Sequence, residues 1–221
     1  MINIKSASTF NTPQRLALAL LSALLIGLAY HFPAVVALTW VAFIPLLLAL
    51  QDVKPLRAIY LGLAAGVGAG LFIQAWIVPS ANVFMGQSVV LSVMTLVAAT
   101  TLFALPFVLF AFIYARLGIY SKKISLLNIL LVPAIWAALA YLNALSASTF
   151  PWFALNLGNF LFNLPELIQL ATVIGVFGFS FLIVGVNYLF FLAIKTKNFD
   201  YFYIGTLIII TQYLVGLFIM E

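Results

Sequence analysis

Seven long runs of apolar residues dominate the sequence, and short charged, proline-containing or polar stretches separate them. The runs cover residues 16–32, 34–50, 58–79, 88–115, 124–145, 166–194 and 201–220. A helix needs about 20 residues to cross the hydrocarbon core of a bilayer, which is about 30 Å thick. We therefore predict an all-α fold, a polytopic membrane bundle of about seven transmembrane helices. Because these runs use most of the chain, we predict a single transmembrane domain over residues 1–221.

The composition excludes a water-soluble protein. Apolar residues make up 67% of the chain, charged residues make up 6%, and the mean hydropathy is +1.28. A soluble surface needs roughly a quarter of its residues charged. The net charge of +5 does not indicate nucleic-acid binding, because the basic residues are scattered singly instead of forming a patch. The chain has no cysteine, which excludes a cysteine nucleophile within it, and we expect no metal and no cofactor.

The basic residues predict the orientation of the bundle. With seven spans, all nine lie on one face of the membrane: Lys5, Arg15, Lys54, Arg57, Arg116, Lys122, Lys123, Lys195 and Lys197. Since basic residues favour the cytoplasmic side, we predict a cytoplasmic N-terminus and a C-terminus on the opposite side. Only His31, Phe32 and Pro33 separate the first two runs. These runs form either a tight hairpin or a partly re-entrant pair, and both versions return the chain to its starting side.

Small residues predict where helices pack closely. Gly62, Gly66 and Gly70 recur every four residues and line one face of the third span, which lets a neighbouring helix approach. Gly175 and Gly178 form a looser version of the same pattern on the sixth span. Thr12 is the expected N-cap of the first helix, with Pro13 at its first position. Prolines inside apolar runs predict kinks, and they are Pro45, Pro106 and Pro133.

No acidic or basic residue lies at the centre of a span, which argues against a proton relay, a voltage sensor or a retinal protein. Gln169 and Asn187 are eighteen residues apart, or five helical turns, so they share a face. We expect such amides to bond across helices instead of binding substrate. His31 lies at a membrane edge without neighbouring ligands, so an interfacial ring is favoured over a catalytic or metal role.

The long connection between the fifth and sixth spans, residues 146–166, combines aromatic residues with asparagines, a glycine and two prolines. This composition is typical of a structured amphipathic loop at the headgroup level. Glu166 opens the next helix, where its charge either complements the helix dipole or contacts a lipid headgroup or partner. Gln74 and Trp76, near the outer end of the third span, are expected to line the same outer-leaflet space as Trp152. For both tryptophans, interfacial anchoring is the default interpretation, and lining this space is the functional one.

Three segments carry a family resemblance. They contain Pro45-Leu-Leu-Leu-Ala-Leu50, then Phe150-Pro-Trp152 with Leu157-Gly-Asn159, and then Gly175-Val-Phe-Gly-Phe-Ser180 followed by Val186-Asn187. Together they resemble the membrane portion of the apolipoprotein N-acyltransferase family, over most of residues 16–195. That family moves an acyl chain from a phospholipid to the N-terminal cysteine of lipoproteins in the bacterial inner membrane. The resemblance thus implies a multi-pass inner-membrane protein that binds phospholipid or lipoprotein acyl chains.

The sequence also departs from the family. The family's Glu-Lys-Cys site lies on a nitrilase-like domain inserted before its final helix, whereas this sequence ends at Glu221 and has no cysteine. We therefore assign no catalytic residue and expect no catalysis by this chain alone; a separate periplasmic nitrilase-like subunit is the expected partner. Trp152 matches a family tryptophan implicated in activity. The residues that we expect to contact lipid or substrate are Gln74, Trp76, Phe150, Trp152, Asn159 and Glu166.

Two other interpretations remain open. Ala140 and Asn143 stand where the family commonly has Glu and Arg, which favours a module without acyl transfer. Such a module would be a structural or assembly subunit, or a lipid carrier. A truncated remnant of a full acyltransferase gene is the third interpretation.

Overall fold

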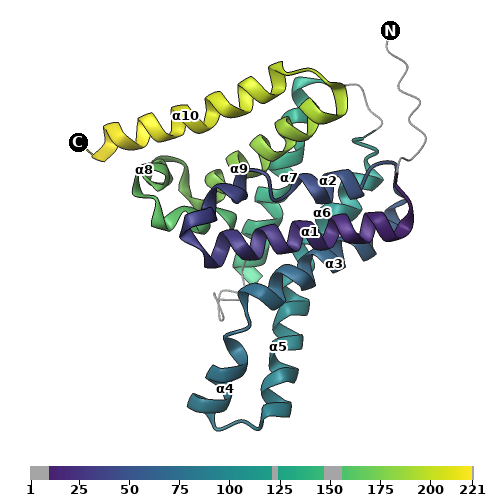
Figure 1. The fold of residues 1–221 in the computed structure, drawn as a ribbon, viewed down its shortest axis with the longest axis vertical. Coiled ribbons are helices and arrows are strands. Elements are labelled where there is room, and N and C mark those ends of the chain that lie inside the picture. The colour runs from purple at the N-terminus through teal and green to yellow at the C-terminus, as the bar shows by residue number, and fades with distance from the viewer. Residues whose placement is uncertain (1–9, 121–123, 147–155, 221) are drawn as a thin grey trace.

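The structure is a computed structural model that describes residues 10–120, 124–146 and 156–220. Within these residues it is helical and has no strand, as Figure 1 shows. The helices are α1 (Thr12–His31), η1 (Pro33–Trp40), α2 (Ile44–Ala49), α3 (Pro55–Ile73), α4 (Ile77–Met85), α5 (Val89–Phe103), α6 (Leu105–Arg116), α7 (Leu126–Ser146), η3 (Leu157–Asn163), α8 (Pro165–Ile168), α9 (Ala171–Thr196) and α10 (Asp200–Met220).

Six helical segments in the described part of the chain are long and apolar enough to cross a membrane. They are Thr12–His31, Pro55–Ile73, Val89–Arg116, Leu126–Leu145, Ala171–Thr196 and Asp200–Met220. The chain is therefore a multi-pass helical membrane protein, and these six segments correspond to six of the seven predicted runs. The seventh run contains only the shorter segment Pro33–Ala49.

The segment Pro33–Ala49 is broken in its middle. Its first half is the 3₁₀ helix η1, and α2 begins only after a turn at residues 41–43. The guanidinium Nη1 of Arg15 donates to the carbonyl oxygens of Ala49 at 2.5 Å and Gln51 at 2.7 Å. Since Arg15 lies in the first turn of α1, the broken segment runs back along α1 to the level where α1 begins. This path has the direction that the predicted return of the chain requires.

Polar side chains from two other helices satisfy the backbone groups that this break frees. The Asn187 amide accepts from Phe43 N at 2.8 Å and donates to Thr39 O at 2.9 Å. The Ser22 hydroxyl donates to Ala42 O. Unpaired backbone groups are costly in hydrocarbon, so a broken helix persists there only when neighbours supply partners. The prediction that Asn187 bonds across helices is confirmed.

Three glycines of α3, Gly62, Gly66 and Gly70, lie against α6 and the end of α5. A Cβ atom at Gly62 would lie 2.6 Å from Phe107 O, and one at Gly66 would lie 2.7 Å from Ala104 Cα. One at Gly70 would lie 3.1 Å from the Phe103 ring. Only hydrogen fits at the first two positions, so α3 and α6 approach to backbone contact.

Gly175 and Gly178 act differently from the predicted packing pattern. Gly175 has φ of 67°, interrupts the helical geometry of α9, and has no atom within 4 Å of its Cβ position. Gly178 faces Ile174 of its own helix at 2.8 Å. The positive φ, which favours glycine, makes Gly175 the site of a kink and not part of a contact surface.

Five expectations about helix ends, breaks and kinks are wrong. Asn11, not Thr12, caps α1, because its side chain accepts from Gln14 N in a capping box. The third and sixth runs are interrupted, at residues 74–76 and 169–170 respectively. Pro45 and Pro106 lie in the first turns of α2 and α6 and so begin new helices instead of kinking continuous ones.

An aromatic cluster fills the core where the α2, α6 and α7 helices meet. The Trp136 ring lies 4.6 Å from Phe43 and 4.9 Å from Phe107, both edge to face. All three side chains are fully buried. Edge-to-face packing favours such contacts beyond simple burial, so the cluster holds the broken segment against the long helices.

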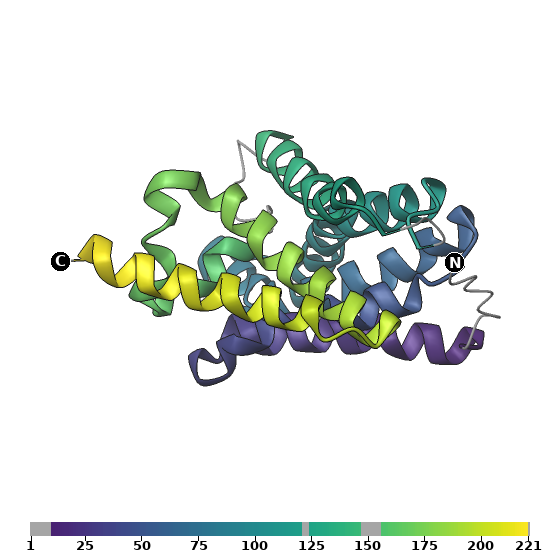
Figure 2. The same ribbon diagram turned by 90° about the horizontal axis from the view of Figure 1, so that it is seen from above.

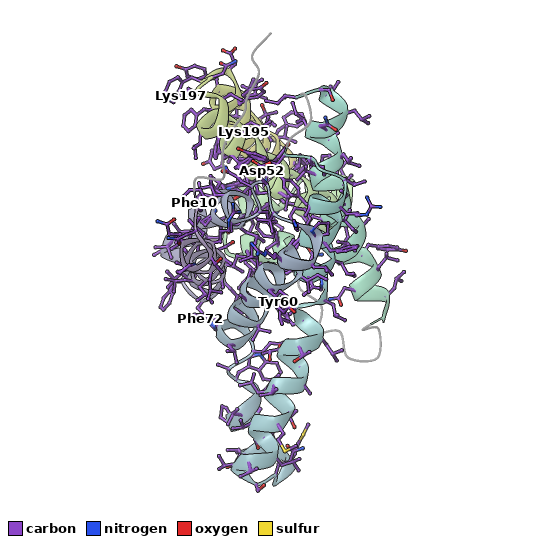
Figure 3. The ribbon with its side chains drawn as sticks, turned by 90° about the vertical axis from the view of Figure 1, so that its right-hand side faces the viewer. Phe10, Asp52, Tyr60, Phe72, Lys195 and Lys197 are labelled. Carbon is purple, nitrogen blue, oxygen red and sulfur yellow. The ribbon has the colours of Figure 1, made fainter. Side chains whose placement is uncertain are left out.

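The described basic residues gather at one end of the molecule, which we call the basic end. Arg15 lies beside the loop that precedes α3, and the Lys195 ammonium donates to Tyr120 O while lying 3.8 Å from the centre of that residue's ring. Figure 3 shows Lys195, Lys197 and Asp52 close together at this end. The other basic residues there are Lys54, Arg57 and Arg116, at the start of α3 and the end of α6.

At the other end of the molecule the helices diverge. Figure 1 shows α4 and α5 standing away from the other helices, while α8 and the last turns of α10 lie on the opposite flank. Figure 2 shows α10 lying along α9. Ring stacking at 5.0 Å between Phe190 and Phe202 joins these two helices near the basic end.

Candidate lipid-facing site

Three helices meet at the end of the molecule opposite the basic residues. The Nε2 atom of His31, at the end of α1, donates to Phe72 O, near the end of α3, over 2.7 Å. Beside it, the Tyr30 ring packs edge to face on Phe160 of η3 with 5.4 Å between centroids. We call this junction of Tyr30, His31, Phe72 and Phe160 the rim. Its exposed imidazole agrees with the interfacial role expected for His31.

Gln74 lies just past the rim, in the break between α3 and α4. Its backbone is paired, since Gln74 N donates to Gly70 O and Gln74 O accepts from Ile77 N. Its side chain is 1% exposed, yet neither Nε2 nor Oε1 has a hydrogen-bond partner. Among the residues that the structure describes, it is the only side chain with two such buried atoms. A buried unpaired amide costs about 1–3 kcal/mol, so it needs an explanation.

Trp76 follows Gln74 by two residues but points differently. It is 44% exposed and lies where α4 begins, whereas the Gln74 amide is enclosed. An exposed indole at the end of a span is typical of interfacial anchoring. The two residues thus share a helix break but do not face one space.

The stretch around η3 is held to α9 by a compact hydrogen-bond network. The Ser180 hydroxyl donates to Asn156 Oδ1 at 2.6 Å, and the backbone N of Gly158 donates to the same oxygen at 3.0 Å. A Cβ at Gly158 would lie 2.6 Å from Val176 O, one residue after the Gly175 kink. Asn159, a predicted contact residue, is exposed beside this clamp.

Glu166 lies in the first turn of α8, a helix of only four residues, and is half-buried. A Cβ at Gly216 of α10 would overlap its carbonyl oxygen, so the two backbones touch. The Gln212 amide, one turn earlier on α10, donates to Leu167 O at 3.0 Å. These contacts fasten the end of α10 to α8 and place the Glu166 backbone beside α10.

The structure therefore brings the expected residues to one end of the bundle without joining them in one cavity. Gln74 and Trp76 lie on one side of the rim, and Asn159 and Glu166 lie on the other. Phe150 and Trp152 lie outside the described residues. Sequence reasoning missed four residues that shape this end: Asn156, Ser180, Gln212 and Gly216. The sequence could have indicated Gln212 and Gly216, because a glutamine and a glycine four residues apart share one face of an otherwise apolar helix.

The chemistry available at the rim is binding chemistry. Amides, an imidazole and one carboxylate lie beside apolar helices, which matches the mixed polar and apolar surface of a lipid near its headgroup. The described residues hold no group of three or more His, Cys, Asp or Glu side chains. The chain has no cysteine to act as a thiol nucleophile.

The sequence is similar to those of known membrane proteins. The family model described as Apolipoprotein N-acyltransferase N-terminal domain matches residues 22–189. A relative named apolipoprotein N-acyltransferase from Geobacter metallireducens is 33% identical over 178 residues, which cover 80% of this chain and 33% of the relative. One with the same name from Chlorobaculum tepidum is 29% identical over 184 residues, or 82% of this chain and 32% of the relative. This chain thus spans about a third of their length, and it belongs to the apolipoprotein N-acyltransferase N-terminal domain family.

Proposed function

We propose that this chain is an inner-membrane domain that holds phospholipid acyl chains, or the lipid anchor of a lipoprotein, for N-acyl transfer. Its family membership and the names of its relatives support a lipid or lipoprotein substrate. The observation that carries the proposal within the fold is the Gln74 amide, which is buried with both polar atoms unpaired. A bound lipid would supply the missing partners if its carbonyl oxygen accepted from Nε2 and one of its hydroxyl, ammonium or amide N–H groups donated to Oε1.

The proposed topology has seven crossings, with the N-terminus in the cytoplasm and the C-terminus outside. The broken segment Pro33–Ala49 counts as a crossing in this proposal because it returns to the level of Arg15. The gathering of the described basic residues at one end supports assigning that end to the cytoplasm. The rim then faces the outer leaflet, where lipid-linked substrates of acyl transfer would enter. The whole chain forms one membrane domain in this account.

The proposed contact residues flank the rim. Gln74 binds the polar part of the lipid when the break between α3 and α4 opens, since its amide is enclosed in this structure, and Trp76 anchors the edge of the site. Asn159 and Glu166 face headgroups from the η3 and α8 side. We include Phe150 and Trp152 in the site only because the family resemblance implies them.

Chemistry is proposed to come from outside these 221 residues. The family resemblance implies a cysteine thiol on a nitrilase-like domain, and this sequence has no cysteine. We infer a nitrilase-like partner subunit that docks at the outer end. Affinity purification of the chain from its native membrane, followed by protein identification, tests this: recovery of such a subunit supports it, and its reproducible absence contradicts it.

Lipid retention tests the binding site itself. Native mass spectrometry of the detergent-purified chain should detect bound phospholipid, and Gln74→Leu should lose it because the variant cannot pair with the polar part of the lipid. Lys197→Gln, at the exposed basic end, serves as the control and should retain the lipid. Equal retention by both variants would contradict the role proposed for Gln74.

A non-catalytic scaffold is the second candidate. Ala140 is buried in α7, at a position where the resemblance implies a glutamate. A membrane domain without that carboxylate fits a structural or assembly subunit. Trp152→Ala distinguishes the candidates: loss of lipoprotein acylation favours the lipid-holding domain, whereas intact acylation with loss of a protein complex favours the scaffold.

A further inference from the structure

The hairpin formed by α4 and α5 projects from the rest of the fold. It stands away from the other helices in Figures 1 and 3, at the far end of the molecule from Lys195 and Lys197. No charged residue occurs between Arg57 and Arg116, so the whole hairpin is uncharged.

The hairpin pairs polar side chains with its own backbone and exposes large apolar side chains. Asn82 Nδ2 donates to Gln87 O at 2.8 Å, and the Ser92 hydroxyl donates to Ser88 O at 3.0 Å. The Thr95 hydroxyl donates to Leu91 O. Six large apolar side chains are more than 60% exposed, and they are Val83, Phe84, Met85, Val89, Val90 and Met94. A helical hairpin in water would instead turn such side chains toward a core.

The hairpin also extends further than a simple crossing requires. Phe72 is level with His31, where α1 ends and the chain turns back, because the two residues share a hydrogen bond. The nine residues of α4 then add roughly 14 Å of helix beyond that level. Pointed along α1, this apolar tip would lie in water above the membrane.

The helix breaks redirect the hairpin. The chain bends at residues 74–76 between α3 and α4, and at Ala104 between α5 and α6. In Figure 1, α1 runs across the picture, whereas α4 and α5 run down it. The hairpin therefore does not continue the direction of α1.

We propose that the α4–α5 hairpin is immersed in the outer leaflet, with lipid acyl chains as its partner. An interface for a soluble protein has a polar rim, often with Arg or other charged residues. The hairpin has no charged residue, and the exposed polar side chains near its tip, Asn82 and Ser88, already bond to its own backbone. The inference does not depend on the proposed acyl-transfer role, since lipid contact by the hairpin holds whatever the rim binds.

Single cysteines test the proposal, because the chain has none of its own. Phe84→Cys and Val90→Cys, each labelled with bimane, are compared in vesicles of phosphatidylethanolamine and phosphatidylglycerol. Leu207→Cys, exposed midway along α10, is the lipid reference, and Asn198→Cys, exposed at the basic end, is the aqueous reference. Brominated acyl chains quench labels in lipid, and iodide quenches labels in water.

The expected result is that both tip labels behave like Leu207→Cys: brominated lipid quenches them, and iodide quenching is lost relative to Asn198→Cys. The proposal is overturned if the tip labels follow Asn198→Cys instead, which would indicate an aqueous arm available to a protein partner. Far-ultraviolet circular dichroism checks that each labelled variant retains its helix content.

Discussion

The two buried glutamines at the outer end provide a matched test of the account. Gln74 and Gln212 are 1% and 2% exposed, but only Gln212 makes a side-chain hydrogen bond, to Leu167 O. Replacing Gln74 by leucine removes two unpaired polar atoms and fills the same space with an apolar side chain. Replacing Gln212 by leucine removes a donor from a buried carbonyl.

The magnitudes follow from these differences. An unpaired buried polar group costs about 1–3 kcal/mol, so Gln74→Leu should stabilise the free protein by a similar amount. For a chain of this length, each kcal/mol shifts the unfolding midpoint by about 2–4 °C, so the midpoint should rise by about 2–12 °C. Gln212→Leu should change the midpoint less, because the lost bond to Leu167 O, worth about 1 kcal/mol, is offset by removal of the unpaired Oε1 atom.

Thermal unfolding in detergent, followed by tryptophan fluorescence, measures both variants under the same conditions. A fall in the midpoint for Gln74→Leu would refute the reasoning, because it would mean that the amide already has a partner within the folded chain. If Gln74→Leu gains stability and loses lipid binding, the unpaired amide lowers the stability of the free protein and serves to bind lipid.

Three further predictions concern the packing of the bundle. Gly66→Ala should lower the free energy of unfolding by about 1–3 kcal/mol, because its Cβ would meet the Ala104 backbone. Gly185→Ala, whose Cβ would lie 3.8 Å from Pro133, should leave the free energy of unfolding unchanged or raise it, and thermal unfolding compares the two variants. Asn187→Leu should lower the free energy of unfolding by about 2–4 kcal/mol, since Phe43 N and Thr39 O both lose their partner. A two-state denaturation curve measures this change. Gly216→Val should separate α10 from α8, and hydrogen exchange should then rise at the amides of both helices while α3 and α6 stay protected; unchanged exchange would contradict the contact.

The long helices could be predicted from the sequence because hydrophobicity and length alone decide whether a segment spans a membrane. The same reasoning grouped the basic residues at one end and assigned Asn187 to a bond between helices. The glycine spacing on α3 marked a face whose Cβ positions meet α5 and α6 in the structure. All of these depend on local composition or on the helical period.

The breaks could not be predicted, because distant residues decide them. The turn at residues 41–43 is stable since Ser22 and Asn187, from α1 and α9, pair with its backbone. Nothing near the turn in the sequence signals these partners. The positive φ of Gly175 is equally hidden, because a glycine permits a kink as readily as it permits close packing.

The unpaired amide of Gln74 was also beyond sequence reasoning. A glutamine at the end of an apolar run is ordinarily solvated, bonded to headgroups or paired with a neighbour. Only the folded arrangement reveals that it is enclosed without a partner. This is the point at which the structure adds most to the account of function.

Mass spectrometry of lipoprotein N-termini tests the central claim most directly. Cells of the native host with and without the gene are compared, and the deletion is complemented with the intact chain. The account predicts that the third, amide-linked acyl chain is lost in the deletion and restored by the chain. Lipoproteins that keep this acyl chain in the deletion would contradict a role in N-acyl transfer.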